Sequence, residues 1–254
     1  MHEHVHAFVE MASGAFELAG PVYEFGFCPA AEPPEGGGLR GSFPEAGYIG
    51  CELGEAARID RLASLDRLPF PDGAARTVVC VNTLEHVFEP RKVVDEMVRI
   101  LAPGGILLLC ESAGPGGSET IDSYWRPTPH ALERLLAPME ATLVGWLGGE
   151  QSPHTVFGLG GKGPVAGGFV RGVNRLINRL PARLQALAAQ PGWTRRLRRH
   201  LFGWLEGEAR RRRRREFHQV HFVVHIAAAE PLAHQLLLGC QPEEPTGTRL
   251  DLSQ

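Results

Sequence analysis

The chain alternates between short apolar runs and longer segments in which apolar positions recur every three or four residues. Residues 77–82 (TVVCVN) and 106–110 (ILLLC) are continuous apolar runs, typical of strands buried on both faces of a parallel sheet. Residues 21–25, 47–52 and 141–147 read as further strands. These runs predict one sheet that is built mainly from the first half of the chain.

Helical segments separate the predicted strands. Residues 3–18 read as a helix, and residues 90–101 have the apolar spacing of an amphipathic helix. A third helix is expected to begin after Thr128, a favoured N-cap residue, with Pro129 at its first position. Strands that alternate with helices predict an α/β fold with a doubly wound, Rossmann-like sheet.

Residues 171–209 differ in character from the first part of the chain. They are helical in pattern, rich in Leu and Arg, and interrupted by Pro181, and a strand-like stretch follows at 217–228. We therefore expect four parts: a Rossmann-like core (1–165), a basic helical insertion (166–216), a closing strand and helix of the core (217–240) and a flexible tail (241–254).

The charge distribution is strongly uneven. The 254 residues carry a net charge of −3, but residues 171–215 hold fourteen arginines and two acidic residues. This segment carries +12 and the rest of the chain −15. Its apolar stripe, which includes Leu176, Ile177, Leu180 and Leu184, suits a bilayer interface or a cover over an active site. Of the two, peripheral membrane contact through 171–215 is the sharper hypothesis. Nucleic-acid binding is not predicted, because nothing in the sequence resembles a module that reads a nucleic-acid groove.

Other classes of protein are excluded by composition. No apolar stretch reaches the roughly 18–20 residues of a membrane span, and the N-terminus lacks the pattern of a signal peptide. Five scattered cysteines without CxxC spacing fit a reducing cytoplasm. We interpret His2, His4 and His6 as part of a solvated terminus rather than a metal tract, and we predict no metal site.

Candidate binding residues follow the predicted strands. Ligands of doubly wound sheets bind at the carboxyl ends of the strands, where Glu24, Gly26, Glu52, Asp66 and Asn82 lie. The two oxygens of Glu52 can accept hydrogen bonds from both ribose hydroxyls, and Gly26 allows a ligand to approach the backbone closely. No P-loop or complete GxGxxG motif is present, so the pattern favours a nucleoside ligand without a pyrophosphate.

Three blocks in order resemble a known family: LDRLPFPDG (65–73), VVCVNTLEHV (78–87) and EMVRILAPGG (96–105). They are similar to class I S-adenosylmethionine-dependent methyltransferases of the small-molecule, methyltransferase type 11-like group. The later block YWRPTP (124–129) resembles the DYWRFTP block of a subgroup associated with bacterial glycan and natural-product pathways. The resemblance implies a Rossmann-like fold and methyl transfer to a small-molecule, glycan or lipid-linked acceptor.

The resemblance also implies roles for individual residues. S-Adenosyl-L-methionine is the expected cofactor, with Glu24 and Gly26 beside its methionine part and Glu52 on its ribose. The remaining cofactor residues are Asp66 and Leu68 around the adenine, and Asn82 and Thr83 towards the methionine end. The substrate mouth is expected to involve Tyr124, Trp125 and Arg126, although Trp125 also suits packing at the sheet edge.

Two questions stay open at this level. His86 is the candidate general base, but a Glu-His pair that opens a helix is more often structural. Cys28 and Ala30 stand where the family usually has glycines, which leaves a second interpretation. On that interpretation, the chain is a degenerate methyltransferase-fold protein that binds a membrane or a polyanion without catalysis.

Overall fold

The computed structural model describes residues 3–26, 39–43, 47–52, 61–62, 65–112, 123–149, 152–163, 167–189, 220–226 and 248–251. Within them lie the helices α1 (Glu3–Phe16), α2 (Pro90–Ile100), α3 (Pro129–Leu136) and α4 (Gly167–Ala189), with short 3-10 turns η2 (Leu39–Ser42) and η3 (Leu84–His86). The strands are β1 (Val22–Phe25), β2 (Tyr48–Glu52), β3 (Arg61–Leu62), β4 (Ala75–Val81), β5 (Leu101–Ser112), β6 (Ala141–Gly149), β7 (Ser152–Gly161), β8 (Val220–Ile226) and β9 (Thr248–Asp251).

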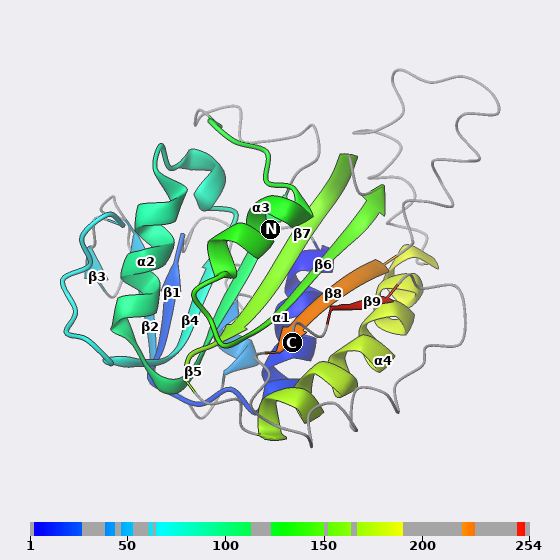
Figure 1. Ribbon diagram of the computed structural model, residues 1–254, viewed down its shortest axis with the longest axis horizontal. Coiled ribbons are helices and arrows are strands. Elements are labelled where there is room, and N and C mark those ends of the chain that lie inside the picture. Colours follow the sequence, from blue (N-terminus) through cyan, green and yellow to red (C-terminus); the bar gives the residue numbers. More distant parts are fainter. Residues whose placement is uncertain are drawn as a thin grey trace.

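The described strands form one sheet in the order β3-β2-β1-β4-β5-β7-β6-β8-β9 (Figure 1). Strands β3, β2, β1, β4 and β5 run parallel, as the apolar runs predicted. The sheet is mixed rather than wholly parallel, because β7 lies antiparallel between β5 and β6. The predicted α/β fold with a Rossmann-like sheet is confirmed, but the expectation of a wholly parallel sheet is wrong, because β7 and β8 both pair antiparallel with β6.

Strand β7 was not predicted because its sequence, SPHTVFGLGG, is rich in glycine. Packing explains the glycines: a Cβ on Gly158 would lie 2.7 Å from Leu136 Cδ1. A Cβ on Gly160 would lie 2.7 Å from Met139 Cγ. Helix α3 and the turn after it therefore press directly on the backbone of β7, and only the tertiary structure reveals this requirement.

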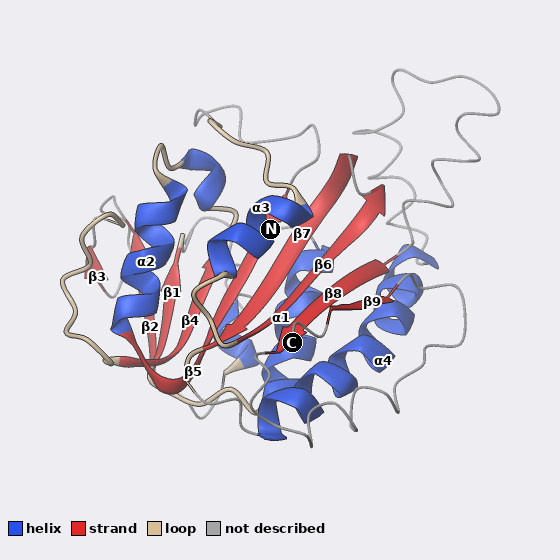
Figure 2. Cartoon of the chain, in the orientation of Figure 1, coloured by secondary structure: helices blue, strands red, loops and turns tan. Residues whose placement is uncertain are grey.

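Helices cover both faces of the sheet, which gives three layers (Figure 2). Helices α2 and α3 pack on one face, in a core that includes Val93, Met97 and Leu132. Helices α1 and α4 pack on the other, in a core that includes Phe8 and Val173. The expected cap of α3 is present, since the backbone N–H of Ala131 donates to the Thr128 hydroxyl.

Helix α4 changes the interpretation of the basic insertion. Leu176, Ile177, Leu180 and Leu184, predicted to face a bilayer or an active-site mouth, are buried against α1 and the sheet. Pro181 does not interrupt the helix, which continues to Ala189. Arginines at the surface of α4 pair with acids of the α1 segment at 3.1 and 3.3 Å: Arg175 with Glu17 and Arg183 with Glu10. Residues 190–216 of the predicted insertion lie outside the described residues.

Three further expectations differ from the structure. Thr248–Asp251, within the segment expected to be a flexible tail, forms β9 and pairs parallel with β8. His4 belongs to α1 and lies 2.7 Å from the Thr155 hydroxyl, so it is not part of a solvated terminus. The third strand is Arg61–Leu62, which places Asp66 in the turn beyond it. No helix in the described segments is long and apolar enough to cross a membrane.

Candidate active site at the carboxyl edge of the sheet

The strand order reverses between β1 and β4, and this defines the candidate site. From β1 the chain first adds β2 and β3 on one side, and then returns to add β4 and β5 on the other. Phe25, the last residue of β1, pairs with both Cys51 and Cys80, so Gly26 lies level with Glu52 and Val81, which end β2 and β4. Neighbouring strands are separated by about 4.8 Å. Predicted residues of three strands therefore line one edge, where such sheets bind ligands.

Gly26 is required by close packing at this edge. Its φ of +85° is a conformation that residues with a side chain rarely adopt. A Cβ at Gly26 would lie 1.6 Å from Thr83 Oγ1. The Thr83 hydroxyl lies 2.9 Å from the carbonyl oxygen of Val81 and 3.2 Å from that of Phe25, so it joins the ends of β4 and β1. Thr83 thus has a structural role, while Asn82 beside it has a positive φ of 47°.

Glu24 is buried rather than presented to solvent. It is 2% exposed and accepts a hydrogen bond from the Tyr48 hydroxyl of β2. The Arg40 guanidinium lies 4.8 Å from the centre of the Tyr48 ring. The backbone of Glu52 ends β2 as expected. The structure brings these two acids to neighbouring strand ends.

Glu111, on β5, is a site residue that the sequence analysis missed. Its fully buried carboxylate accepts hydrogen bonds from the backbone N–H groups of Thr83 and Leu84, at 3.2 Å each. Burial, together with the nearby Glu85, raises the pKa of Glu111 to about 8 against the opposing effect of these donors. An acidic residue directly after the apolar run ILLLC was the available signal.

The segment that Glu111 anchors carries the candidate base. His86 Nε2 lies 3.4 Å from Glu85 Oε1, and the His86 side chain is partly exposed. The backbone N–H of Tyr124 donates to the Glu85 carbonyl at 2.8 Å, and Trp125 Nε1 donates to the Val87 carbonyl at 2.8 Å. The expected substrate residues Tyr124 and Trp125 therefore lie beside His86. Arg126 follows them and is exposed.

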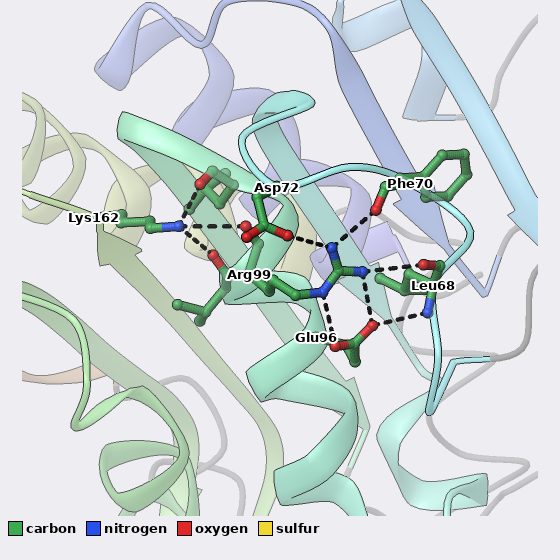
Figure 3. A network of polar contacts seen from close by, with 8 residues as sticks. Leu68, Phe70, Asp72, Glu96, Arg99 and Lys162 are labelled. Carbon is green, nitrogen blue, oxygen red and sulfur yellow. Dashed lines mark hydrogen bonds and ion pairs between the residues drawn. The ribbon is translucent and has the colours of Figure 1, made fainter.

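A polar network fixes the turn that carries Leu68 (Figure 3). Glu96 Oε2 accepts from the backbone N–H of Leu68 at 3.0 Å, and the Arg99 guanidinium donates to the carbonyl oxygens of Leu68 and Phe70. The adjacent Arg99 holds the pKa of Glu96 below its usual value. The side chain of Leu68 is buried and that of Asp66 is exposed. This turn is positioned by α2, independently of any ligand.

The strand order gives a Rossmann-like sheet in which the ends of β1, β2 and β4 meet at one edge. Residues 52–109 match the family described as "Methyltransferase domain", which confirms the predicted resemblance. The matched segment runs from the end of β2 into β5, and so includes Asp66, Asn82 and His86.

Individual relatives are similar over parts of the chain. A demethylmenaquinone methyltransferase of Clavibacter sepedonicus is 44% identical over 48 residues, 19% of this chain and 20% of the relative. An uncharacterized methyltransferase of Mycobacterium sp. (strain KMS) is 41% identical over 100 residues, 34% of this chain and 40% of the relative. The chain thus spans less than half the length of these curated relatives. A possible histamine N-methyltransferase from Thermotoga maritima has a TM-score of 0.44 at 18% identity, covering 63% of this chain and 90% of that structure.

Metal binding has no evident site in the described ranges. No group of three or more His, Cys, Asp or Glu residues is placed there to hold an ion. Cys51, Cys80 and Cys110 are buried free thiols. Burial raises the pKa values of Cys80 and Cys110 well above the usual value, so neither is activated as a thiolate.

Proposed function

We propose that this protein transfers the methyl group of S-adenosylmethionine to a small-molecule acceptor. The observation that supports the proposal is the reversal of strand order between β1 and β4, which brings Gly26, Glu52 and Asn82 to one edge. The residues present fit the cofactor: an acidic residue, Glu52, ends β2, and Gly26 with its positive φ turns the chain after β1 at the same edge. Both features suit a nucleoside that lies across the ends of the strands.

Each predicted residue keeps a role in this proposal. Glu52 accepts hydrogen bonds from the ribose hydroxyls, since a carboxylate has two acceptor oxygens. Asp66 and Leu68 frame the adenine, and the anchoring of their turn to α2 gives that subsite a fixed shape. The methionine part is assigned to the remaining residues, namely Glu24, Gly26, Asn82 and Thr83.

Methyl transfer from a sulfonium does not require the protein to form a covalent intermediate. The bound cofactor supplies an electrophilic methyl group on a sulfonium. The protein aligns the acceptor with that methyl group and excludes water. Tyr124, Trp125 and Arg126 are assigned to the acceptor side because they lie beside the 83–88 segment. His86 is the candidate to receive a proton if the acceptor must lose one.

The finer identity of the acceptor belongs to this proposal as well. Glycan and lipid-linked acceptors remain candidates through the 124–129 block, and a cytoplasmic location remains a prediction. For the part of 171–215 that lies in α4, the membrane hypothesis loses support, because the apolar stripe of this helix is buried inside the protein. The same burial weakens the non-catalytic, membrane-binding alternative over those residues.

Titration calorimetry with S-adenosylhomocysteine tests the proposal. We expect a low- to mid-micromolar Kd, roughly −7 to −8 kcal/mol. Glu52→Ala should weaken binding at least tenfold, because two charge-assisted hydrogen bonds of ~1.5–3 kcal/mol each are lost. Glu17→Ala is the matched control, since this acid lies by α1 and pairs with Arg175. Absence of binding by the folded wild-type protein would favour the degenerate alternative.

A further inference from the structure

Three aromatic side chains are exposed beside the candidate site. Phe88 is 73% exposed, Tyr124 55% and Trp125 46%, and in the described part of the chain they are the large apolar side chains that face solvent. We call these three residues the aromatic platform. Exposing neighbouring aromatic rings leaves unfavourable apolar surface in water, so such a cluster is typical of a binding surface.

The platform is built from two segments that are held together. Phe88 follows η3, and Tyr124 and Trp125 lie on the approach to α3. The rings of Phe88 and Tyr124 are 5.8 Å apart and nearly perpendicular, at 87°. Backbone bonds from Tyr124 to Glu85, and the bond from Trp125 Nε1 to Val87, fix the pairing.

The contacts around the platform restrict the chemistry of its ligand. The indole N–H of Trp125 is already donated to a backbone carbonyl, so the exposed part of this side chain is its apolar ring. Two cations near the start of α2, the helix that follows Phe88, pair with acids of the same segment: Arg91 with Asp95 at 2.9 Å, and Lys92 with Glu89 at 3.7 Å. An aromatic ring of a ligand gains contact with the exposed faces of the platform directly.

We propose that the aromatic platform binds an aromatic ring of the methyl acceptor. This inference rests on the proposed function, because the platform adjoins His86 and the end of β4. Phe88 is a binding residue that the sequence analysis did not identify. A ring on the platform places the acceptor at the strand ends, where the cofactor is assigned.

Binding of 2-naphthol, with and without S-adenosylhomocysteine, tests the inference in the full chain. Saturated 2-decalol is the comparison ligand, because it has a similar size and hydroxyl group without the aromatic faces. We expect 2-naphthol to bind at least fivefold more tightly than 2-decalol. Phe88→Ala and Tyr124→Ala should each weaken 2-naphthol binding at least fivefold and leave the affinity for S-adenosylhomocysteine unchanged. Arg183→Ala, on α4 at the opposite face, is the control.

The outcomes separate the two proposals. Equal affinity for the two ligands, or undiminished 2-naphthol binding by both variants, overturns the platform inference even when S-adenosylhomocysteine binds. If the wild-type protein binds 2-naphthol but not S-adenosylhomocysteine, the result counts against the proposed function. The 2-naphthol titration in the absence of S-adenosylhomocysteine still tests the platform. Sedimentation with anionic vesicles tests the competing explanation. Vesicle binding that both variants abolish, with 2-naphthol binding unchanged, would make the platform a membrane contact instead.

Discussion

Replacing Glu111 perturbs the candidate site by removing the buried carboxyl group that holds the backbone of Thr83 and Leu84. Glu111 Oε1 lies 3.2 Å from the backbone nitrogen of Leu84, and Oε2 lies 3.2 Å from that of Thr83. Glu111→Gln removes the titration and keeps one carbonyl oxygen, which can take the Oε1 position and accept from Leu84. Glu111→Leu has a similar volume and no acceptor, so both amides lose their partner.

The magnitude follows from the pKa of Glu111, which burial raises from 4.5 to about 8. This difference corresponds to about 5 kcal/mol. Between pH 4.5 and 8 the folded protein holds the proton that the unfolded chain has released. The stabilising contribution is therefore complete below pH 4.5 and declines by about 1.4 kcal/mol per pH unit as the pH rises through this window.

Urea denaturation at pH 5, 6, 7 and 8 measures the effect. The free energy of unfolding of Glu111→Gln, relative to wild type, should rise by roughly 4 kcal/mol from pH 5 to pH 8. At pH 5, Glu111→Leu should be less stable than wild type by roughly 2–6 kcal/mol, since two buried amides are left unpaired at 1–3 kcal/mol each. Parallel stability curves for wild type and Glu111→Gln would refute the reasoning, because they would show that Glu111 does not titrate differently in the folded state.

The remaining predictions concern the neighbouring residues. His86→Ala should lose thermal stability and keep most of its turnover per folded molecule; a stable variant that binds cofactor and is 10²–10⁴-fold slower would instead identify His86 as the base. Gly26→Ala should lower the melting temperature by several degrees, because its Cβ would lie 1.6 Å from Thr83 Oγ1 and its φ is positive. In a thermal melt, Gly26→Ala should cost less in a Thr83→Gly background than in wild type; equal costs in the two backgrounds would show that the contact is not the cause.

Local sequence determined the parallel half of the fold. The runs at 77–82 and 106–110 predicted β4 and the centre of β5, because continuous apolar strands need cover on both faces. The start of α3 followed from Thr128 and Pro129, whose effects act within one turn of helix. The residues at the carboxyl ends of β1, β2 and β4 could also be predicted as site residues, because adjacent parallel strands end at the same edge of the sheet.

Tertiary contacts decided the rest, because the partners involved are distant in sequence. Strand β7 needs glycines only because Leu136 and Met139 press on it, and glycine by itself lowers the preference for a strand. The stripe of α4 was correctly periodic, but periodicity does not say whether a bilayer or α1 covers it. Glu111 and Phe88 joined the site through contacts with the 83–88 and 123–125 segments. The sequence determines the chemical groups that each side chain carries, whereas the tertiary packing determines which other residues those groups contact.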